Sequence, residues 1–422
     1  MKVLFVFDRP FIPSRGGAEV RALSHLDYFE SRGITCDLFL IDRYNNYQLW
    51  RQDDLNALKE SRNGDIFLHR AIGLHPDVIY RKLMILATLL SGELPDAAHP
   101  IHALPGMIRY FRRIVSESSY NLIFFNHSYY SGALAKHTDI SCKTVIDTHD
   151  IYTNLLNEIY SLKKQSKINP LVSDASPAKK IQHYIYHKFS SFEINYELSL
   201  QRELKLLSLF DRIIAIAPNE LDLIKQCVDL RNKSYHIPMI APDISLLSRI
   251  KVEDEIFKLM FIGSQYDPNV EAIYEFCTQV LPKLNDKVYL YLVGGVSNSQ
   301  DLPSDSRIVR LGFVENLDEL YSQIDAVVLP LSFGSGVSVK AVEALAHGKP
   351  VVSMPKGVRG LAVAHEKEVL IAQTFNDFIP LIQRLMIDHE LQRFLRTGAL
   401  NYIQKYHSKS AVYSSLDSVI FD

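Results

Sequence analysis

The chain has 422 residues, of which 47% are hydrophobic and 22% are charged, and its formal net charge is −2. This composition is typical of a globular protein and excludes a disordered or a collagen-like chain. The charge is uneven, at +3 over residues 1–240 and −5 over residues 241–422. Neither half has the strong positive excess expected of a nucleic-acid-binding protein, so we expect no nucleic-acid partner.

Cysteine spacing and hydropathy bear on the compartment. The four cysteines lie far apart, with neither a Cys-x-x-Cys nor a Cys/His spacing. We therefore expect no disulfide framework, no zinc site and a reducing cytoplasm. The start of the sequence, MKVLFVFDRP, lacks the pattern of a signal peptide. No run approaches the ~18 apolar residues of a membrane span, and the apolar run at residues 83–90 predicts a buried helix. These features predict a cytoplasmic protein, with peripheral contact at the inner face of the membrane as a further expectation.

The N-terminal half alternates strands and helices. Residues 3–7 predict a strand, Pro10 to Gly17 a loop, residues 18–32 a helix that ends at Gly33, and residues 36–41 a second strand. This β-loop-α-β order is typical of a parallel sheet. Further strands are predicted at residues 121–125, 144–147 and 212–216. Each precedes a helix or a loop, so the half is predicted to be a doubly wound α/β domain.

A second series of strands begins near residue 257. Strands are predicted at residues 258–262, 288–293, 308–311, 326–329 and 350–353, and a helix from about Gln392. Proline and charges cluster at 238–255 and predict a linker. We expect α/β architecture with two Rossmann-like, doubly wound domains at residues 1–240 and 255–400. The remaining residues, 401–422, form a predicted C-terminal tail that could pack back on the N-terminal domain.

The most informative motif is PLSFGSGVSVKAVEALAHG at residues 330–348. A strand ends at Pro330, the loop holds Gly334 and Gly336, and a helix is predicted from near Val337. Lys340 and Glu343 are three residues apart and share one helix face. Amides at a helix start, with a lysine one turn in, can bind a diphosphate, and the glutamate can accept from two sugar hydroxyls. The alternative, a plain glycine-rich turn with a solvated lysine and glutamate, is equally compatible with the spacing.

This motif, continued by KPVV and followed by Gly357 and Gly360, resembles the donor-site signature of family 4 glycosyltransferases. FIGSQYDPNVEAIYEFCTQVLPKL and LGFVENLDELYSQIDAVVLP resemble adjoining parts of that family's C-terminal domain, and PSRGGAE resembles its N-terminal glycine loop. The resemblance covers most of residues 1–400. It implies the GT-B fold, two Rossmann-like domains facing across a cleft. It also implies a retaining, metal-independent enzyme that uses a nucleotide-diphosphate sugar as co-substrate and needs no cofactor.

The resemblance assigns the donor site to the C-terminal domain. It places the donor ribose on Glu343, the second glutamate of the family's E-x7-E motif, while this chain has Ser335 at the first. We expect backbone amides of Gly336 and Val337 to act in its place. The base is expected near Gly312–Glu315. The remaining donor-binding candidates are Gly263, Ser264, Asn269, Phe313, Val314, Gly334 and Lys340.

The chain departs from the family at the diphosphate. Ser264 and Asn269 stand where many members carry an arginine and a lysine. A departing diphosphate needs compensating charge in a cleft of low dielectric. Lys340, with Arg359 behind it, is the best remaining candidate. For Ser264 and Asn269 the alternative is helix capping and turn formation.

Polar residues that follow strands are the candidates in the N-terminal domain. His127 follows the strand NLIFF, and His149 and Asp150 follow the strand TVIDT, at the strand ends where open α/β sheets bind ligands. The resemblance makes His127 and Asp150 catalytic candidates, and His149 and the loop glycines Gly16 and Gly17 acceptor-binding candidates. Alternatively, the histidines are structural, Asp150 caps the next helix and the glycines form a plain loop. Asp147, within the strand, is expected to be structural.

Basic residues gather on the N-terminal half. Arg109, Arg112 and Arg113 are interleaved with apolar residues on a predicted helix, and lysines are frequent between residues 163 and 188. Two interpretations stay open, a patch for an anionic membrane that carries a lipid-linked acceptor, and a solvated helix face beside a loop.

The sequence therefore predicts a retaining glycosyltransferase that moves a sugar from a nucleotide-sugar donor to a glycan or lipid-linked acceptor, in surface polysaccharide or glycoconjugate synthesis. Two alternatives stay open. One is a nucleotide-sugar epimerase or hydrolase of the same fold, and the other is a non-catalytic relative that binds a nucleotide-sugar or glycan within an assembly. The uncharged Ser264, Asn269 and Ser335 favour the non-catalytic relative.

Overall fold

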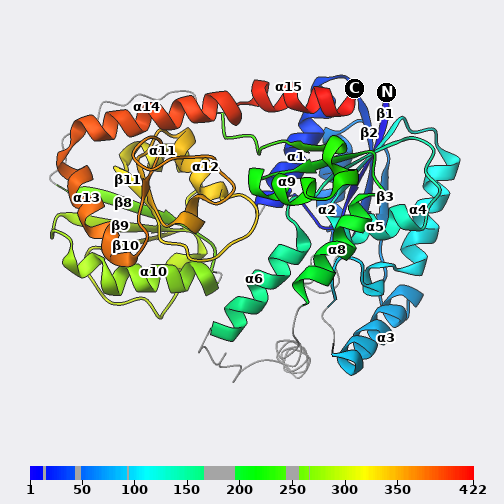
Figure 1. Ribbon diagram of the computed structural model, residues 1–422, viewed down its shortest axis with the longest axis horizontal. Helices are drawn as coiled ribbons and strands as arrows, with labels where there is room; N and C mark the ends of the chain where they lie inside the picture. The colour runs from blue at the N-terminus through cyan, green and yellow to red at the C-terminus, as the bar shows by residue number, and fades with distance from the viewer. Residues whose placement is uncertain (13–15, 43–48, 93–94, 166–194, 244–255, 266) are drawn as a thin grey trace. The chain divides into compact units, whose positions relative to one another are not determined.

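The computed structural model describes residues 1–422 apart from 13–15, 43–48, 93–94, 166–194, 244–255 and 266 (Figure 1). The chain divides into two compact units. Unit 1 comprises Met1–Ile237 together with Val419–Asp422, and unit 2 comprises Pro238–Ser418. The linker predicted at 238–255 begins at this boundary, and most of it lies outside the described residues.

Unit 1 is built on a seven-stranded sheet in the order β3-β2-β1-β4-β5-β6-β7. Every neighbouring pair is parallel. The strands are β1 (Lys2–Phe7), β2 (Thr35–Ile41), β3 (Ile66–His69), β4 (Leu122–Asn126), β5 (Lys143–Asp147), β6 (Arg212–Ala215) and β7 (Ser234–His236). Its helices are α1 (Gly17–Ser31), α2 (Gln52–Ser61), α3 (Pro76–Ser91), α4 (Pro105–Glu117), α5 (Ser128–Lys136), α6 (Tyr152–Gln165), α8 (Tyr196–Leu207) and α9 (Pro218–Lys225).

Both faces of this sheet are buried. Successive side chains of a strand point to opposite faces, so Leu4 and Val6 of β1 join one core with Phe111 of α4. Phe5 faces the other way, where its ring stacks on Phe124 of β4 with centroids 5.5 Å apart. Burial on both faces explains why these strands are almost continuously hydrophobic instead of alternating.

Unit 2 repeats the architecture with a six-stranded sheet in the order β10-β9-β8-β11-β12-β13. Its strands are also parallel and comprise β8 (Phe257–Ile262), β9 (Val288–Val293), β10 (Ile308–Gly312), β11 (Ala326–Leu329), β12 (Val351–Ser353) and β13 (Leu370–Ile371). Its helices include α10 (Asp267–Gln279), α11 (Leu317–Gln323), α12 (Val339–Ala346), α13 (Phe378–Ile387) and α14 (His389–Tyr406). The last helix, α15 (Lys409–Ile420), ends within unit 1, where the Lys143 ammonium donates to the Ile420 carbonyl.

Each sheet has one point where the strand order reverses. In unit 1 the chain leaves β1 towards β2 on one side and returns as β4 on the other, and in unit 2 the corresponding strands are β8, β9 and β11. Open α/β sheets bind ligands at the carboxyl ends of the strands at this point. Residues that follow β1 and β4 in unit 1, and β8 and β11 in unit 2, are therefore the places to look for a site.

The helix predicted to be buried at residues 83–90 is not buried. It forms the second half of α3, and the side chains of Leu83, Leu86 and Leu90 are all exposed. An apolar run determines that a segment can be helical but does not say which of its faces another element covers. No helix in the described ranges has both the length and the apolar character needed to cross a bilayer.

Candidate functional site

The loop between β11 and α12 contains the glycines of the predicted donor motif. Gly334 and Gly336 both have positive φ, of 136° and 61°, which favours glycine. The helix begins at Val339, two residues later than predicted, because Ser338 is still extended and occupies the N-cap position. The loop therefore turns through both glycines before the helix starts.

A second segment, residues 355–360, holds this loop in place. The Arg359 guanidinium donates through Nε to the Ser335 carbonyl at 2.8 Å, and the Ser338 amide donates to the Arg359 carbonyl at 3.1 Å. At Gly360, a Cβ atom would lie 2.8 Å from the Gly336 carbonyl oxygen. The two segments therefore touch through backbone, and Arg359 stabilises the loop's shape.

Three of the predicted donor residues come together beside the loop. The Lys340 ammonium donates to the Asn269 amide oxygen at 3.3 Å, and the Asn269 amide nitrogen donates to the Ser264 carbonyl at 3.0 Å. Burial, and then the charge of the nearby Arg359, lowers the pKa of Lys340 to about 8. A half-buried ammonium that bonds a neutral oxygen and lies 5.9 Å from the centre of the Phe261 ring favours an anion beside it. Asn269 thus positions Lys340 and does not replace its charge.

Glu343 lies one turn further along α12, and burial raises its pKa. Tyr321 of α11 is fully buried and stacks on His347, with ring centroids 3.8 Å apart. Among the described residues, neither the Tyr321 hydroxyl nor the buried Ser338 hydroxyl has a hydrogen-bond partner. Burial, and then the charge of Glu343, raises the pKa of Tyr321 well above its usual value. Unpartnered buried hydroxyls cost stability, so each of these two leaves hydrogen-bonding capacity unused in the free protein.

The remaining donor candidates surround the same strand ends. Gly263 follows β8 and lies against Gly294, where a Cβ atom would be only 2.6 Å from the Gly263 carbonyl. Phe313, after β10, is highly exposed, and Val314 is half-buried. Val337 is buried between Gly336 and Ser338. The exposed phenyl ring is suited to stack on a flat ring.

In unit 1, His127 follows β4 as predicted and contacts residues that follow β1. Its Nδ1 lies 2.9 Å from Asp8 Oδ1, and Arg9 Nη2 lies 3.3 Å from its Nε2. Because arginine only donates, Nε2 accepts and the imidazole is neutral with its proton on Nδ1. Tyr129 joins this group, donating to Asp8 and accepting from Arg9. Asp8, Arg9 and Tyr129 were not predicted, although Asp8 and Arg9 follow a strand just as His127 does.

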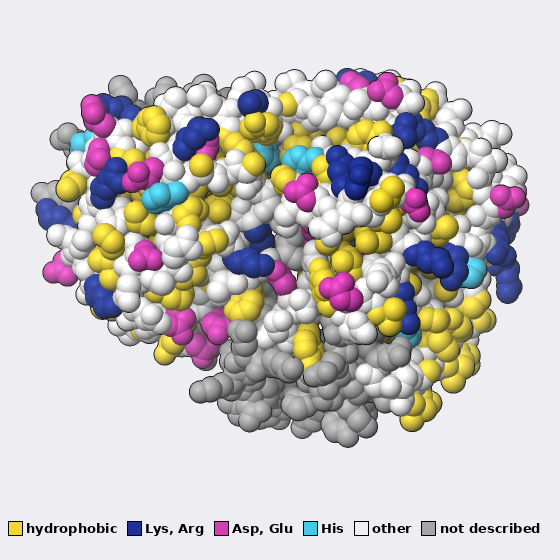
Figure 2. All heavy atoms as spheres, in the orientation of Figure 1, with side chains coloured by type: hydrophobic (Ala, Val, Ile, Leu, Met, Phe, Trp, Pro, Cys, Tyr) yellow, Lys and Arg dark blue, Asp and Glu magenta, His cyan; other side chains and the backbone are white. Residues whose placement is uncertain are grey.

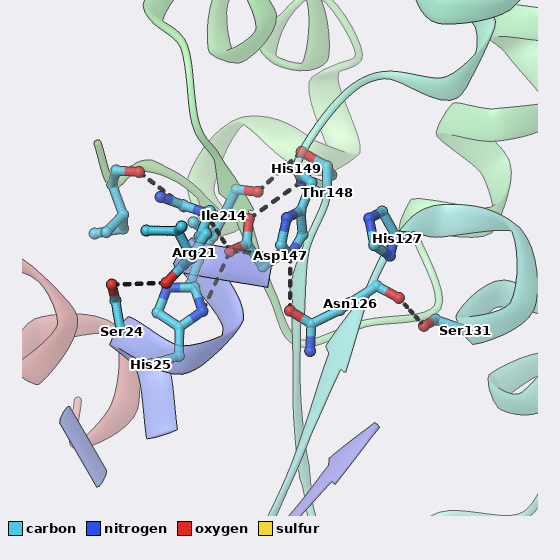
Figure 3. Close-up of polar contacts among 12 residues, drawn as sticks. Arg21, Ser24, His25, Asn126, His127, Ser131, Asp147, Thr148, His149 and Ile214 are labelled. Atoms are coloured by element: carbon cyan, nitrogen blue, oxygen red, sulfur yellow. Dashed lines mark hydrogen bonds and ion pairs between the residues drawn. The ribbon is translucent and has the colours of Figure 1, made fainter. Parts of the chain in front are cut away.

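His149 lies beside His127 (Figure 3), with ring centroids 4.4 Å apart. Its Nε2 lies 2.8 Å from the Asn126 side-chain oxygen, while the Asn126 nitrogen donates to the Val6 carbonyl. Nε2 is therefore the protonated nitrogen, and the buried Nδ1 keeps a lone pair that has no partner among the described residues. Burial lowers the pKa of His149 well below its usual value. His149 is thus a neutral hydrogen-bond acceptor.

Asp147 lies at the centre of a buried charge cluster behind His149 (Figure 3). The Arg21 guanidinium of α1 donates to both carboxylate oxygens, at 2.6 and 3.2 Å, and His25 Nδ1 lies 3.4 Å away. Burial alone would raise the pKa of Asp147, but Arg21 and the two histidines lower it below its usual range. The same burial lowers the pKa of His25 to about 3, so His25 is neutral. These buried contacts are compatible with the structural role expected for Asp147, which stays a prediction.

Asp150 pairs with an unpredicted residue, Glu220 of α9. Burial, and then the charge of Asp150, raises the pKa of Glu220 to about 9. Glu220 therefore keeps its proton at neutral pH beside Asp150. The first amides of α6, from Tyr152 and Thr153, donate to Glu203 instead, so Glu203 takes the capping part that was considered for Asp150.

Gly16 and Gly17 lie at the start of α1, with Gly16 at the N-cap. The preceding Arg15 lies outside the described residues. The arginines at 109, 112 and 113 are exposed on α4. Most of the lysine-rich stretch at 163–188 falls in the range that the structure does not describe.

Comparison with known proteins bears on both units. Residues 256–388 match the family model described as "Glycosyl transferases group 1", a stretch that includes the loop and α12. The chain is also 23% identical over 252 residues to an uncharacterized 44.6 kDa protein in the cps region of Klebsiella pneumoniae. That alignment covers 56% of this chain and 61% of the relative's length.

Several solved structures resemble the whole chain. HepE from Anabaena in complex with UDP-glucose gives a TM-score of 0.62 at 15% identity, covering 100% of this chain and 99% of HepE. Sucrose-phosphate synthase from Thermosynechococcus elongatus gives a TM-score of 0.61 at 15% identity, covering 99% of this chain and 98% of the synthase. The lipopolysaccharide outer core galactosyltransferase WaaB gives a TM-score of 0.62 at 13% identity, covering 100% of this chain and 99% of WaaB. The predicted GT-B fold of two Rossmann-like domains is confirmed.

The matched domain and the fold together support a glycosyltransferase of the GT-B type. The residues that follow β8 and β11 lie where this architecture binds ligands.

Proposed function

We propose that the protein is a retaining, metal-independent glycosyltransferase of family 4, which transfers a sugar from a nucleotide-diphosphate sugar to a glycan or lipid-linked acceptor. One observation carries the proposal. At the point where the strand order of unit 2 reverses, a glycine loop leads into α12, where the buried Ser338 hydroxyl has no partner among the described residues and the half-buried Lys340 ammonium bonds Asn269. These groups suit a polar, anionic ligand.

In this proposal the residues of unit 2 share the work of binding the donor. Lys340 and the amides of Gly336 and Val337 would hold the diphosphate, because cations and amides at a helix start favour negative charge. Glu343 would accept hydrogen bonds from the ribose. Tyr321 would lie behind it and donate from its hydroxyl. The base would stack on Phe313.

Unit 1 would bind the acceptor and the reacting sugar. His127 and His149, both neutral, would accept hydrogen bonds from sugar hydroxyls, and Gly16 and Gly17 would allow close approach of the acceptor. Asp150 would receive or orient the proton of the acceptor hydroxyl. The leaving phosphate would assist the incoming hydroxyl on the same face of the sugar, which retains the anomeric configuration without a nucleophilic residue.

The relatives suggest the donor and the pathway. HepE has been solved with UDP-glucose, WaaB is a lipopolysaccharide galactosyltransferase, and the Klebsiella relative is encoded in a cps region. We therefore propose that the donor is a UDP-sugar and that the transferred group is a hexosyl group. We propose surface polysaccharide or lipopolysaccharide synthesis as the pathway. A cytoplasmic location follows from the use of a nucleotide-sugar.

The test combines binding with turnover. Thermal-shift measurements against a panel of nucleoside diphosphates should show stabilisation by UDP, because a ligand that binds the folded state raises its stability. The Glu343→Gln variant should lose this shift and should lose transfer from the UDP-sugar. The matched control Glu319→Gln, on the exposed side of α11, should keep both. NMR of the product distinguishes retention from inversion, and unchanged transfer by Glu343→Gln would refute the donor-site assignment.

A non-catalytic binding protein stays as the second candidate, since Ser264 and Asn269 are uncharged where a diphosphate must be compensated. It predicts that UDP-sugar binds and is neither transferred nor hydrolysed by the wild-type protein. Transfer to any acceptor excludes it.

A further inference from the structure

His347 lies at the end of helix α12, and both of its ring nitrogens face hydrogen-bond acceptors. Nδ1 lies 2.8 Å from the Glu343 carbonyl oxygen, and Nε2 lies 2.9 Å from Asp318 Oδ1 of α11. The Asp318 side chain is 58% exposed, where water favours the ionised carboxylate. A carbonyl and an ionised carboxylate can only accept. A neutral imidazole would turn a lone pair towards one of these oxygens, so the contacts favour a ring that carries both protons.

The surroundings of the ring suit a positive charge. The His347 side chain is only 5% exposed, and its ring stacks on Tyr321 with the two planes inclined at 14°. A cation over the face of an aromatic ring is attracted by the electrons of that ring. His347 is also the C-cap residue of α12, where the helix dipole favours a cation. The stacked phenol and the helix end therefore stabilise the imidazolium together with Asp318.

Two cations close to His347 act in the opposite direction. Arg396 of α14 contacts Gly348, where a Cβ atom would lie 3.1 Å from the arginine Cγ, and the Lys349 ammonium donates to the Ile324 carbonyl at 2.8 Å. Figure 2 shows basic and acidic side chains interspersed over the visible face of unit 2, at the left of the view. The protonation of His347 therefore depends on its immediate partners and not on a broad field of one sign.

The charge of His347 matters because Glu343 precedes it by one turn on the same face of α12. Burial raises the pKa of Glu343, and His347 opposes this more strongly than any other group. Asp318 adds to the effect of burial, and Lys340 opposes it. An ionised Glu343 can accept hydrogen bonds from two ribose hydroxyls, whereas the protonated acid would turn a donor towards one of them. A cation one turn away thus favours the form of Glu343 that a ribose needs.

We propose that His347 is a positively charged positioning residue of the donor site, held by Asp318 and Tyr321, which keeps Glu343 ionised for the donor ribose. The inference deepens the proposed function and rests on it, because the proposed function assigns Glu343 to the ribose. His347 acts through Glu343 and is assigned no contact with the donor.

The first experiment determines the protonation of the ring in the full chain. Proton–nitrogen correlation spectra of the histidine side chains, recorded at neutral pH and assigned with the His347→Phe variant, report on Nδ1 and Nε2 separately. We expect both nitrogens of His347 to be protonated. In the Asp318→Asn variant, which lacks the carboxylate, one of them should lose its proton. A wild-type ring with only one protonated nitrogen would overturn the proposal.

The second experiment measures the ribose contact by calorimetric titration with UDP and with 2′-deoxy-UDP at neutral pH. The wild type should prefer UDP by about tenfold. His347→Phe keeps a ring to stack on Tyr321 but removes the charge, so its preference should fall to about threefold or less. His347→Lys restores a cation at the helix end and should keep most of the preference. The matched control His389→Gln changes an exposed histidine of unit 2 and should behave as the wild type.

The variants separate an electrostatic role from a structural one. A wild-type preference in His347→Phe would overturn the proposal, and so would an equal loss of preference in His347→Phe and His347→Lys, which would make the role of the ring structural. Thermal unfolding of each variant shows that it is folded. Equal binding of the two nucleotides by the wild type would refute the assignment of Glu343 to the ribose, and with it the role of His347. In that case the spectra would still establish the charge of the ring, so the two failures are distinguishable.

Discussion

The rings of His127 and His149 stack at the carboxyl ends of the neighbouring strands β4 and β5, 4.4 Å apart. Both residues have positive φ, of 60° and 57°, a conformation that few residues other than glycine adopt. Such strain persists only where the surroundings enforce it, and it is frequent at functional sites. Here Asp8 fixes one ring and Asn126 the other, so two neutral imidazoles are held at the position where the strand order reverses.

The first prediction concerns His127. His127→Asn should lower kcat by about a hundredfold, because asparagine tolerates positive φ but cannot provide the imidazole. The thermal shift with UDP should be unchanged, since donor binding is assigned to unit 2. Steady-state kinetics with a UDP-sugar measure the effect, and the exposed His137→Asn is the control. A wild-type kcat in the His127→Asn variant would contradict the assignment of His127 to the catalytic site.

The second prediction concerns acid stability. The pKa of His25 is about 3 in the folded chain and about 6.5 when unfolded. Between these values only the unfolded chain binds the proton, so stability is complete above pH 6.5 and is lost as the pH falls towards 3. His25→Gln should reduce the slope of unfolding free energy by about 1 kcal/mol per pH unit in this range.

Urea unfolding at pH 4 to 7, followed by tryptophan fluorescence, measures this slope. The single tryptophan, Trp50, is buried in unit 1 and therefore reports on that unit. Phe124→Leu provides the control, because it disturbs a ring 5.0 Å from His25 without removing a titratable group. That variant should be less stable with an unchanged slope. A wild-type slope in His25→Gln would mean that another group dominates the acid response.

The third prediction uses the lowered pKa of Lys340. As the pH rises through about 8, the free protein loses this charge, so nucleoside diphosphate binding should weaken by about tenfold between pH 7.5 and 9.5. Lys340→Arg should weaken less over the same range, because a guanidinium stays charged. Isothermal titration calorimetry measures the change in affinity with pH for the wild type and for Lys340→Arg. Ionisation of the ligand affects both proteins equally and cancels when the two changes are compared.

The Lys340→Met variant should bind the nucleoside diphosphate weakly at every pH. The exposed Lys287→Met should follow the wild-type curve. A Lys340→Arg curve parallel to that of the wild type would show that another group causes the pH dependence.

The fourth prediction contrasts two buried tyrosines. The Tyr321 hydroxyl has no partner among the described residues, whereas the Tyr120 hydroxyl donates to Asp37 at 2.8 Å. Tyr321→Phe should stabilise the free protein by about 1 kcal/mol and weaken UDP binding, while Tyr120→Phe should destabilise it by about 1–3 kcal/mol. Calorimetric unfolding with and without UDP measures both effects. A less stable Tyr321→Phe would indicate that its hydroxyl is already satisfied.

Much of the fold follows from local patterns. Strands such as β1 and β8 are short apolar runs that end at a glycine or proline loop, and burial on both faces makes them easy to recognise. Strand β3 was missed, because IFLH lies between polar residues and is only half-buried for most of its length. The exposed face of α3 could not be predicted, since whether a helix face is covered depends on elements far away in the sequence.

The candidate site was predictable to the extent that it follows strand ends. His127 and His149 follow the ends of β4 and β5, and Asn269 and Lys340 lie in the first turns of the helices that come after β8 and β11. The contact between Arg21 and Asp147 spans 126 residues of sequence, and no local pattern indicates it. The same is true of Glu220 beside Asp150. Arg9 could have been found from the sequence, because it is the second residue after the end of β1.

The way Arg359 joins the two loops of unit 2 defines what can be exchanged between enzymes of this architecture. Its side chain donates to the Ser335 carbonyl and its own carbonyl accepts from Ser338. Because both bonds use backbone atoms of the loop, a chimaera whose imported 331–338 loop follows another backbone path would lose both bonds and the tight contact at Gly360. The two segments therefore form one structural unit, and an exchange of the loop should carry residues 355–360 with it.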